Sequence, residues 1–307
     1  MMELISKMVV LILMFLFGLQ CLRIGLYQLS YQRSKDILHR FSRTPLLAIV
    51  TGFAATCLLQ SSSVVIVIAM GLITTKYMTI RQGIGIMLGA NLGTTLTGEI
   101  LSISFDPPYA LLLAVGAVLI MMQKRKLFAS GTIIFGLSAI FLALDNFSGF
   151  IEEVMRWPLA ATLLLQMNES NLAALLFGII GTAIIQSSSA MFGITISLLQ
   201  ADVISMTGAF AILLGSNIGT CITAGIAGLT LDKQARVIAS SHLWYNVIGV
   251  ILALPLLAFI DRFSGLLADD PAKQLAHLSV LFNTLTILLF YPFLHLFESF
   301  LTRKLQE

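Results

Sequence analysis

The stretch TCLLQSSSVV, at residues 56–65, places a glutamine and three consecutive serines between apolar residues. The same pattern returns as TAIIQSSS at 182–189, so Gln60 and Gln186 are 126 residues apart. Polar residues at this density usually mark a surface loop, yet apolar sequence continues on both sides of each copy.

A second motif repeats with the same spacing. LGANLGTTLT at 88–97 returns as LGSNIGTCIT at 214–223, and Asn91 and Asn217 are also 126 residues apart. Two separate motifs that share one offset indicate an internal duplication. The positions that match best are polar, which favours a functional reason for the duplication over packing alone.

The composition is that of an integral membrane protein. Of the 307 residues, 58% are hydrophobic and 11% are charged, whereas a soluble domain carries about 25% charged residues. No basic cluster is long enough to indicate a nucleic-acid partner. The first apolar run lacks a small-residue cleavage site, which predicts a transmembrane helix and not a signal peptide. The apolar stretches are approximately 8–29, 45–74, 83–102, 108–122, 127–144, 171–200, 204–230, 237–260 and 275–298.

Segment 45–74 is too long for one crossing of a membrane and too short for two. A single helix would be about 45 Å long, against a hydrocarbon core of ~30 Å. Two spans that meet at Gln60 would reach only about 21 Å and 15 Å. The remaining solution is a re-entrant hairpin, whose tip must lie against protein or a water-filled cavity. Segment 171–200 has the same form around Gln186.

The distribution of positive charge supports two re-entrant hairpins. If the other seven apolar segments cross, 13 Lys and Arg residues lie on one face and 4 on the other, leaving out Arg23 within the first helix. If each hairpin crossed once, the split would be 9 to 8. Cytoplasmic loops carry the excess of Lys and Arg. We therefore expect a multi-pass plasma-membrane protein with its N-terminus outside and its C-terminus in the cytoplasm.

The expected fold is an all-α polytopic membrane protein with two inverted-topology repeats, about seven crossing helices and two re-entrant hairpins. Such repeats, with broken helices at the midplane, are typical of secondary transporters. Repeat 1 is expected at 1–126, with its hairpin at 45–74 and a broken helix at 83–102. Repeat 2 is expected at 127–260, with an external segment at 145–170 (a surface helix plus loop), a hairpin at 171–200 and a broken helix at 204–230. One additional C-terminal helix is expected within 261–307.

The two motifs supply the candidate binding groups. Each hairpin tip offers a carboxamide and three hydroxyls, and each second motif adds an Asn and a Thr. Free N–H groups at a helix N-terminus attract anions, whereas freed carbonyl and hydroxyl oxygens suit a hard cation such as Na⁺. The candidate substrate-binding and ion-binding residues are Gln60, Ser61, Ser62, Ser63, Asn91, Thr94, Gln186, Ser187, Ser188, Ser189, Asn217 and Thr220.

We expect no Lys or Arg near either motif within the membrane. Proton coupling usually needs membrane carboxylates or histidines, and only Glu99 and His242 are candidates. Glu99 aligns with Gly225 in the second copy, which favours Na⁺ over H⁺. Arg23 is expected to pair or to extend toward the interface within the bundle.

A smaller repeat, which we call the aromatic-Asn echo, relates HLWYN at 242–246 to SVLFN at 279–283, because both segments end in an aromatic residue followed by Asn. Polar adhesion between membrane helices is the favoured interpretation of this pair, with direct ligand binding as the alternative. Neither a nucleophile–base set, nor a metal cluster, nor a Walker loop is present. The sequence therefore does not indicate an enzyme or a cofactor.

These motifs resemble the type II sodium-dependent phosphate cotransporters and their bacterial relatives. The resemblance rests on QSSS at 60–63 and 186–189, on GANLGTT at 89–95 and on GSNIGTC at 215–221, and it covers nearly the whole chain. It implies Na⁺-coupled symport of inorganic phosphate by alternating access, with both ions bound by the two QSSS regions. Na⁺ is the coupling ion, with its individual ligands left open.

Two alternatives stay open: a Na⁺- or H⁺-coupled transporter of another small oxyanion or of a dicarboxylate, and a membrane scaffold or regulator without flux. The expected partners are inorganic phosphate, Na⁺ and the lipid bilayer, with a possible homo-oligomer.

Overall fold

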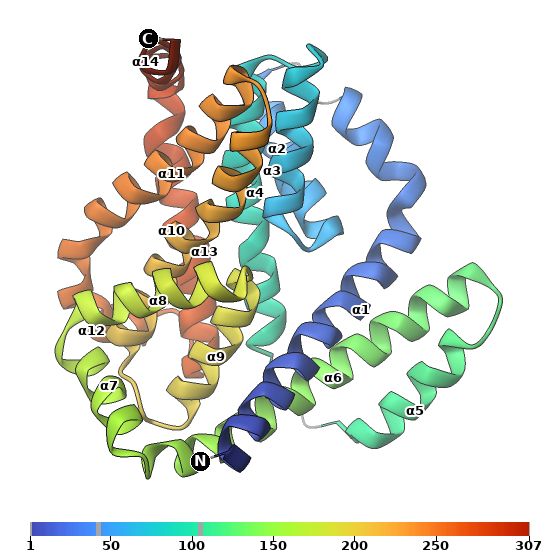
Figure 1. Cartoon of the computed structure of the whole chain (residues 1–307), viewed down its shortest axis with the longest axis vertical. Helices are drawn as coiled ribbons and strands as arrows, with labels where there is room; N and C mark the ends of the chain where they lie inside the picture. The colour runs from blue at the N-terminus through green and yellow to red at the C-terminus, as the bar shows by residue number, and fades with distance from the viewer. Residues whose placement is uncertain (1, 41–43, 104–106, 307) are drawn as a thin grey trace.

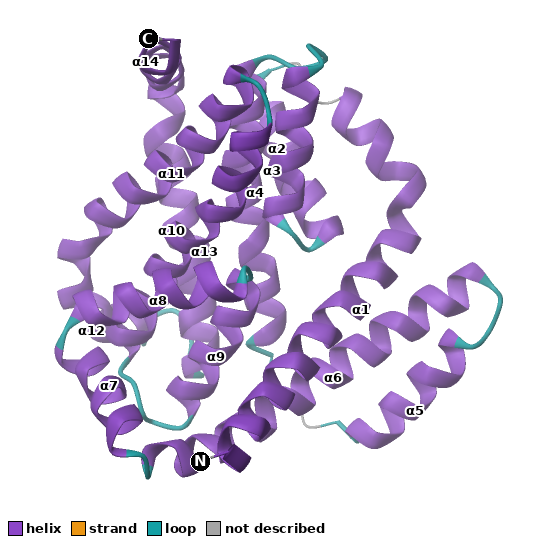
Figure 2. Ribbon diagram, viewed as in Figure 1, coloured by secondary structure: helices purple, strands orange, loops and turns teal. Residues whose placement is uncertain are grey.

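A computed structural model describes residues 2–40, 44–103 and 107–306. Within these ranges the chain is helical, with no strand, as Figure 2 shows. The predicted all-α fold is therefore confirmed for the described residues. Arg43, one of the cationic residues counted above, lies outside them. The helices are α1 (Met2–Arg40), α2 (Pro45–Leu59), α3 (Ser62–Thr74), α4 (Ile80–Leu101), α5 (Tyr109–Ile120), α6 (Arg125–Met155), α7 (Pro158–Glu169), α8 (Asn171–Ile185), α9 (Ser188–Gln200), α10 (Met206–Thr230), α11 (Lys233–Ala253), α12 (Ile260–Ser264), α13 (Pro271–Phe290) and α14 (Leu294–Gln306), with 3₁₀ turns at Leu254–Phe259 and Tyr291–Phe293.

Six helical stretches in the described part of the chain are long and apolar enough to cross a membrane. A seventh is possible if α7 and α8, which meet at an angle of 119°, form one bent span. The six are Glu3–Leu29, Ile80–Leu101, Arg125–Met155, Met206–Thr230, Lys233–Ser264 and Pro271–Lys304.

The crossing predicted at 108–122 falls on a short helix in the structure. Helix α5 has 12 residues, and a helix of that length rises only about 18 Å, short of the ~30 Å core. Segment 145–170 also differs from the expected helix plus loop, because α6 continues to Met155 and α7 begins at Pro158.

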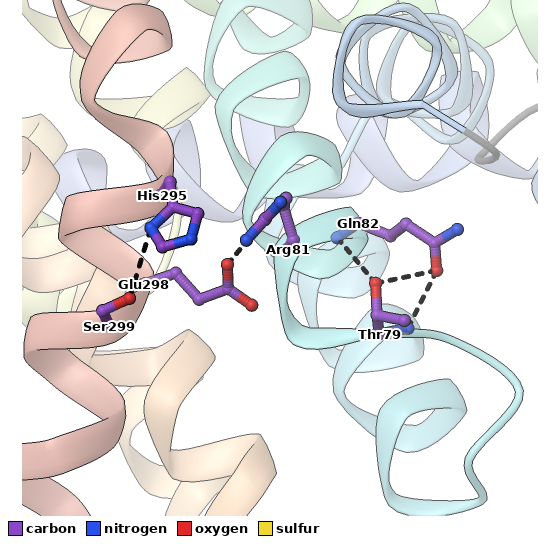
Figure 3. A network of polar contacts seen from close by, with 6 residues as sticks. All are labelled: Thr79, Arg81, Gln82, His295, Glu298 and Ser299. Atoms are coloured by element: carbon purple, nitrogen blue, oxygen red, sulfur yellow. Dashed lines mark hydrogen bonds and ion pairs between the residues drawn. The ribbon is translucent and has the colours of Figure 1, made fainter.

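Figure 1 shows how the long helices pack against one another. α1 and α6 pack along each other, with α5 folded back against α6. The N-terminus and the C-terminal helix α14 lie at opposite ends of the long axis. At the end that carries α14, Arg81 of α4 pairs with Glu298 of α14 at 2.7 Å (Figure 3).

Each QSSS motif separates two short helices, as the sequence predicted. α2 ends at Leu59 and α3 begins at Ser62, while α8 ends at Ile185 and α9 begins at Ser188. The break has a local cause, because the glutamine at each tip adopts the left-handed conformation, with φ of 50° at Gln60 and 55° at Gln186. A non-glycine residue adopts this conformation rarely, and a helix cannot continue through it.

The backbone follows the period of the sequence. Helices α8, α9 and α10 begin at residues 171, 188 and 206, each 126 residues after the starts of α2, α3 and α4 at 45, 62 and 80. The described non-glycine residues with positive φ form two pairs with the same offset, Gln60 with Gln186 and Lys76 with Asp202. Each copy of the repeated sequence therefore adopts the same local conformation.

The prediction that 83–102 and 204–230 are broken helices is wrong. α4 runs without interruption for 22 residues and α10 for 25 residues. The motif glycines permit close packing instead: a Cβ at Gly89 would overlap the backbone carbonyl of Ile49 in α2, and one at Gly215 would overlap that of Leu175 in α8. Each motif helix thus packs directly against the first arm of its hairpin.

Candidate functional site

The two hairpin tips line one cavity, which we call the tip cavity. Its volume is about 50 Å³, and one water molecule needs roughly 10–15 Å³ on this scale. The cavity therefore has room for a few water molecules or one small ion. It is lined by Arg23, Gln60, Ser61, Ser62, Ser63, Thr94, Thr97, Gln186, Ser187, Ser188 and Ser189.

A second cavity, the side cavity, has a volume of about 30 Å³. It shares Thr94, Ser188 and Ser189 with the tip cavity, so the two adjoin. Side-chain oxygens from four helices line it. Its lining residues are Asn91, Thr94, Thr95, Gly98, Ser188, Ser189, Phe192, Leu213, Ser216, Asn217, Ser279 and Asn283.

All predicted site residues except Thr220 line one or both cavities. The hydroxyl of Thr220 donates to the backbone carbonyl of Ser216 at 2.9 Å, within its own helix. Sequence reasoning also missed two residues of α13, Ser279 and Asn283. Their signal is the SVLFN echo, for which adhesion is the favoured interpretation and direct ligand binding the alternative.

Two helix N-termini face the tip cavity. Ser61 caps α3 by accepting from the N–H of Val64, and Ser187 caps α9 by accepting from the N–H of Ala190. The other N–H groups in the first turns of α3 and α9 also have no acceptor within their helix. These N–H groups belong to serines that line the tip cavity. Two positive dipole ends at one small cavity favour an anion there.

Arg23 overturns the expectation that no Lys or Arg lies near the motifs. The side chain comes from α1, lines the tip cavity and donates from Nε to the backbone carbonyl of Gln60 at 2.9 Å. The available signal was a single arginine in a long apolar helix, because ionisable residues inside a membrane usually have a function.

The aromatic-Asn echo divides between two roles. In α11, His242 Nε2 lies 3.1 Å from Asn91 Oδ1, and Asn246 donates to the Cys221 thiol at 3.2 Å. Both α11 side chains are 1% exposed, so this copy joins helices as expected. In α13, Asn283 lines the side cavity instead.

Glu99, a candidate for proton coupling, pairs with His277 of α13. Their Oε1 and Nδ1 atoms are 2.8 Å apart, and neither residue lines the tip cavity or the side cavity. Sequence reasoning did not single out His277.

Long apolar helices around small polar cavities define the class of polytopic membrane proteins with polar cavities inside the helix bundle. The family model described as Na⁺/Pi-cotransporter matches residues 14–149 and again 155–289. This chain therefore belongs to the Na⁺/Pi-cotransporter family, a family of transporters.

The chain is similar to several curated proteins. The "Uncharacterized protein YqeW" of Bacillus subtilis is 38% identical over 83% of this chain and 84% of that protein. The "Putative inorganic phosphate export protein YjbB" of Escherichia coli is 24% identical over 82% of this chain, which is 46% of that protein. The rat "Sodium-dependent phosphate transport protein 2A" is 33% identical over 31% of this chain and 16% of that protein. No solved structure matches the chain.

Proposed function

We propose that the protein is a Na⁺-coupled transporter of inorganic phosphate that works by alternating access. The observation that carries this proposal is the tip cavity, where two QSSS motifs and two helix N-termini lie around one small space. Family membership supports phosphate as the substrate. The name of the Escherichia coli relative refers to export, so the direction of net transport is left to the gradients.

The size of the tip cavity favours an inorganic oxyanion over a dicarboxylate. At about 50 Å³, it has room for roughly three to five water-sized atoms. Phosphate has five non-hydrogen atoms, whereas a four-carbon dicarboxylate has eight.

The side cavity suits Na⁺. The polar side chains in its lining are all Asn, Thr and Ser, which offer neutral oxygens of the kind that a hard cation prefers. A cation bound there would lie next to Ser188 and Ser189, which also line the tip cavity. Occupancy of one cavity would then favour occupancy of the other, which is the basis of coupling.

The alternating-access part of the proposal requires inverted repeats, with repeat 1 at 1–126 and repeat 2 at 127–260. The matched helix starts and the two family matches support the repeats. Termini on opposite faces require an odd number of crossings, which the six long helices and the short α5 would together supply. In this arrangement each hairpin enters from a different side, and the outward-facing and inward-facing states exchange the roles of the two repeats.

Reconstitution of the purified chain into liposomes tests the function. Labelled phosphate should enter or leave the liposomes only when a Na⁺ gradient is imposed, and not with a K⁺ or pH gradient of equal size. Sulfate and succinate serve as competitors, and inhibition by succinate alone would indicate a dicarboxylate transporter. Absence of flux under every gradient would indicate a scaffold or regulator.

A further inference from the structure

Arg23 is a cation within an apolar helix that has no acidic partner among the described residues. Its one hydrogen bond to the part of the chain that the structure describes joins Nε to the backbone carbonyl of Gln60 at 2.9 Å. The ion pairs of the described residues join other groups: Lys7 with Glu3 and Glu153, Arg81 with Glu298, and His277 with Glu99. A guanidinium carries five N–H donors, so most of those on Arg23 lack a protein acceptor.

An uncompensated charge at this position is costly. An arginine in a membrane interior is unfavourable, and such residues face the bundle interior or a water-filled cavity, pair with other charges or backbone carbonyls, and mark substrate pathways. Arg23 lines the tip cavity together with both hairpin tips. The two helix N-termini there add partial positive charge, so the lining of the tip cavity carries an excess of positive charge.

We propose that Arg23 is the fixed counter-charge of the anion, binding a phosphate oxygen across the tip cavity through the N–H groups that protein does not occupy. This inference rests on the proposed function and adds a residue outside the duplicated motifs. Because arginine matches the geometry of a phosphate better than lysine does, the residue type contributes as well as the charge.

A second consequence concerns charge selectivity. A fixed cation stabilises a dianion more than a monoanion, because the Coulomb energy scales with the charge of the ligand. Phosphate gains its second negative charge between about pH 6 and pH 8. Affinity for total phosphate should therefore rise across this range in the native protein, and rise less when Arg23 is neutral.

The test uses the purified full chain in detergent with labelled phosphate at saturating Na⁺, and compares the native protein with R23K, R23Q and R125Q. Arg125 is a matched control, because its guanidinium also donates to a backbone carbonyl of α1, that of Gln28, at 3.0 Å and 2.6 Å. It does not line the tip cavity.

We expect R23Q to weaken phosphate binding by about 100-fold and R23K by about tenfold, as for loss of a charge-assisted contact. R125Q should stay within about twofold of the native protein. The pH dependence should flatten in R23Q alone. Thermal stabilisation by Na⁺ in the absence of phosphate should persist in R23Q, because only the anion loses a contact.

Three outcomes would overturn the inference. If R23Q binds phosphate as R125Q does, Arg23 is not the counter-charge. If R23Q and R23K both lose the Na⁺ stabilisation together with phosphate binding, Arg23 acts through the structure of the tip. If the native protein binds no phosphate at all, the proposed function itself fails, and that result is separate from the other two.

Discussion

The two hairpin tips have nearly the same backbone and very different surroundings. Gln60 is 4% exposed. Its backbone carbonyl accepts from Arg23 at 2.9 Å, its side-chain oxygen accepts from Thr97 at 2.8 Å, and its side-chain amide donates to the backbone carbonyl of Cys57 at 2.8 Å. Gln186 is exposed, and no bond to its side chain occurs within the described residues.

The difference is not a difference between the duplicated motifs themselves, because Thr97 and its counterpart Thr223 are both threonines within those motifs. With the offset of 126 residues, Arg23 corresponds to Gly149, around which a Cβ would meet open space, and Thr97 corresponds to Thr223. Local sequence thus determines the conformation of each tip, whereas neighbouring helices determine how firmly each tip is attached. We expect the first tip to be the fixed side of the site and the second tip to be the side that moves.

The largest effect should come from serines that both tips contribute. Ser62→Ala or Ser188→Ala should each abolish Na⁺-dependent phosphate flux, with a loss of at least about 100-fold, because each removes a donor at the tip cavity. Flux in liposomes is the measurement, normalised to the amount of folded protein.

Ser299 is on α14 and lines neither cavity. Ser299→Ala is therefore the matched control for these serine variants and should transport normally. Normal uptake in both S62A and S188A would eliminate the tip cavity as the binding site.

Thr97→Val should weaken the attachment of the first tip to α4. Removing the hydroxyl leaves the buried Gln60 oxygen without a donor, at a cost of about 1–3 kcal/mol of unfolding free energy. The same change at the corresponding residue, Thr223→Val, should cost less than about 0.5 kcal/mol. Denaturant unfolding in detergent measures both, and equal costs would show that the two tips are attached alike.

The caps should behave identically in the two tips. Ser61→Ala and Ser187→Ala each remove a hydroxyl that accepts from a first-turn N–H, which costs about 1 kcal/mol. We expect the two losses in unfolding free energy to agree within about 0.5 kcal/mol. A clear difference would indicate that the local structure also differs between the tips.

The smallest effect should come from the ion pair between α4 and α14 (Figure 3). The side chains of Arg81 and Glu298 are 41% and 20% exposed, and a pair of this kind contributes about 0–1 kcal/mol. Glu298→Gln should therefore shift the thermal midpoint by no more than a few degrees and leave flux unchanged. A loss of flux in this variant would connect α14 to transport.

The sequence predicted the helical class and the breaks at Gln60 and Gln186, because those features depend on composition and on local backbone chemistry. It did not predict that α4 and α10 are continuous. Glycine permits both a helix break and a close contact, and only the neighbouring α2 and α8 decide between them.

The sequence also missed Arg23, Ser279 and Asn283, although it identified most of the cavity lining. Arg23 is 37 residues from Gln60, and Ser279 and Asn283 are on α13, outside the duplicated part of the chain. The 126-residue period does not place Arg23 at the tip cavity or Ser279 and Asn283 at the side cavity, because their positions follow from how distant helices pack.

The glycine contacts also constrain how a transport cycle could proceed. α2 and α4 approach so closely at Gly52 and Gly89 that any side chain would collide with the opposite backbone, and α8 and α10 do the same at Gly178 and Gly215. Such an interface has little freedom to slide or to open. Each pair should therefore behave as one rigid unit with its tip at the end, and movement should occur between the two pairs. Spin labels within one pair would keep their separation while labels on opposite pairs changed theirs.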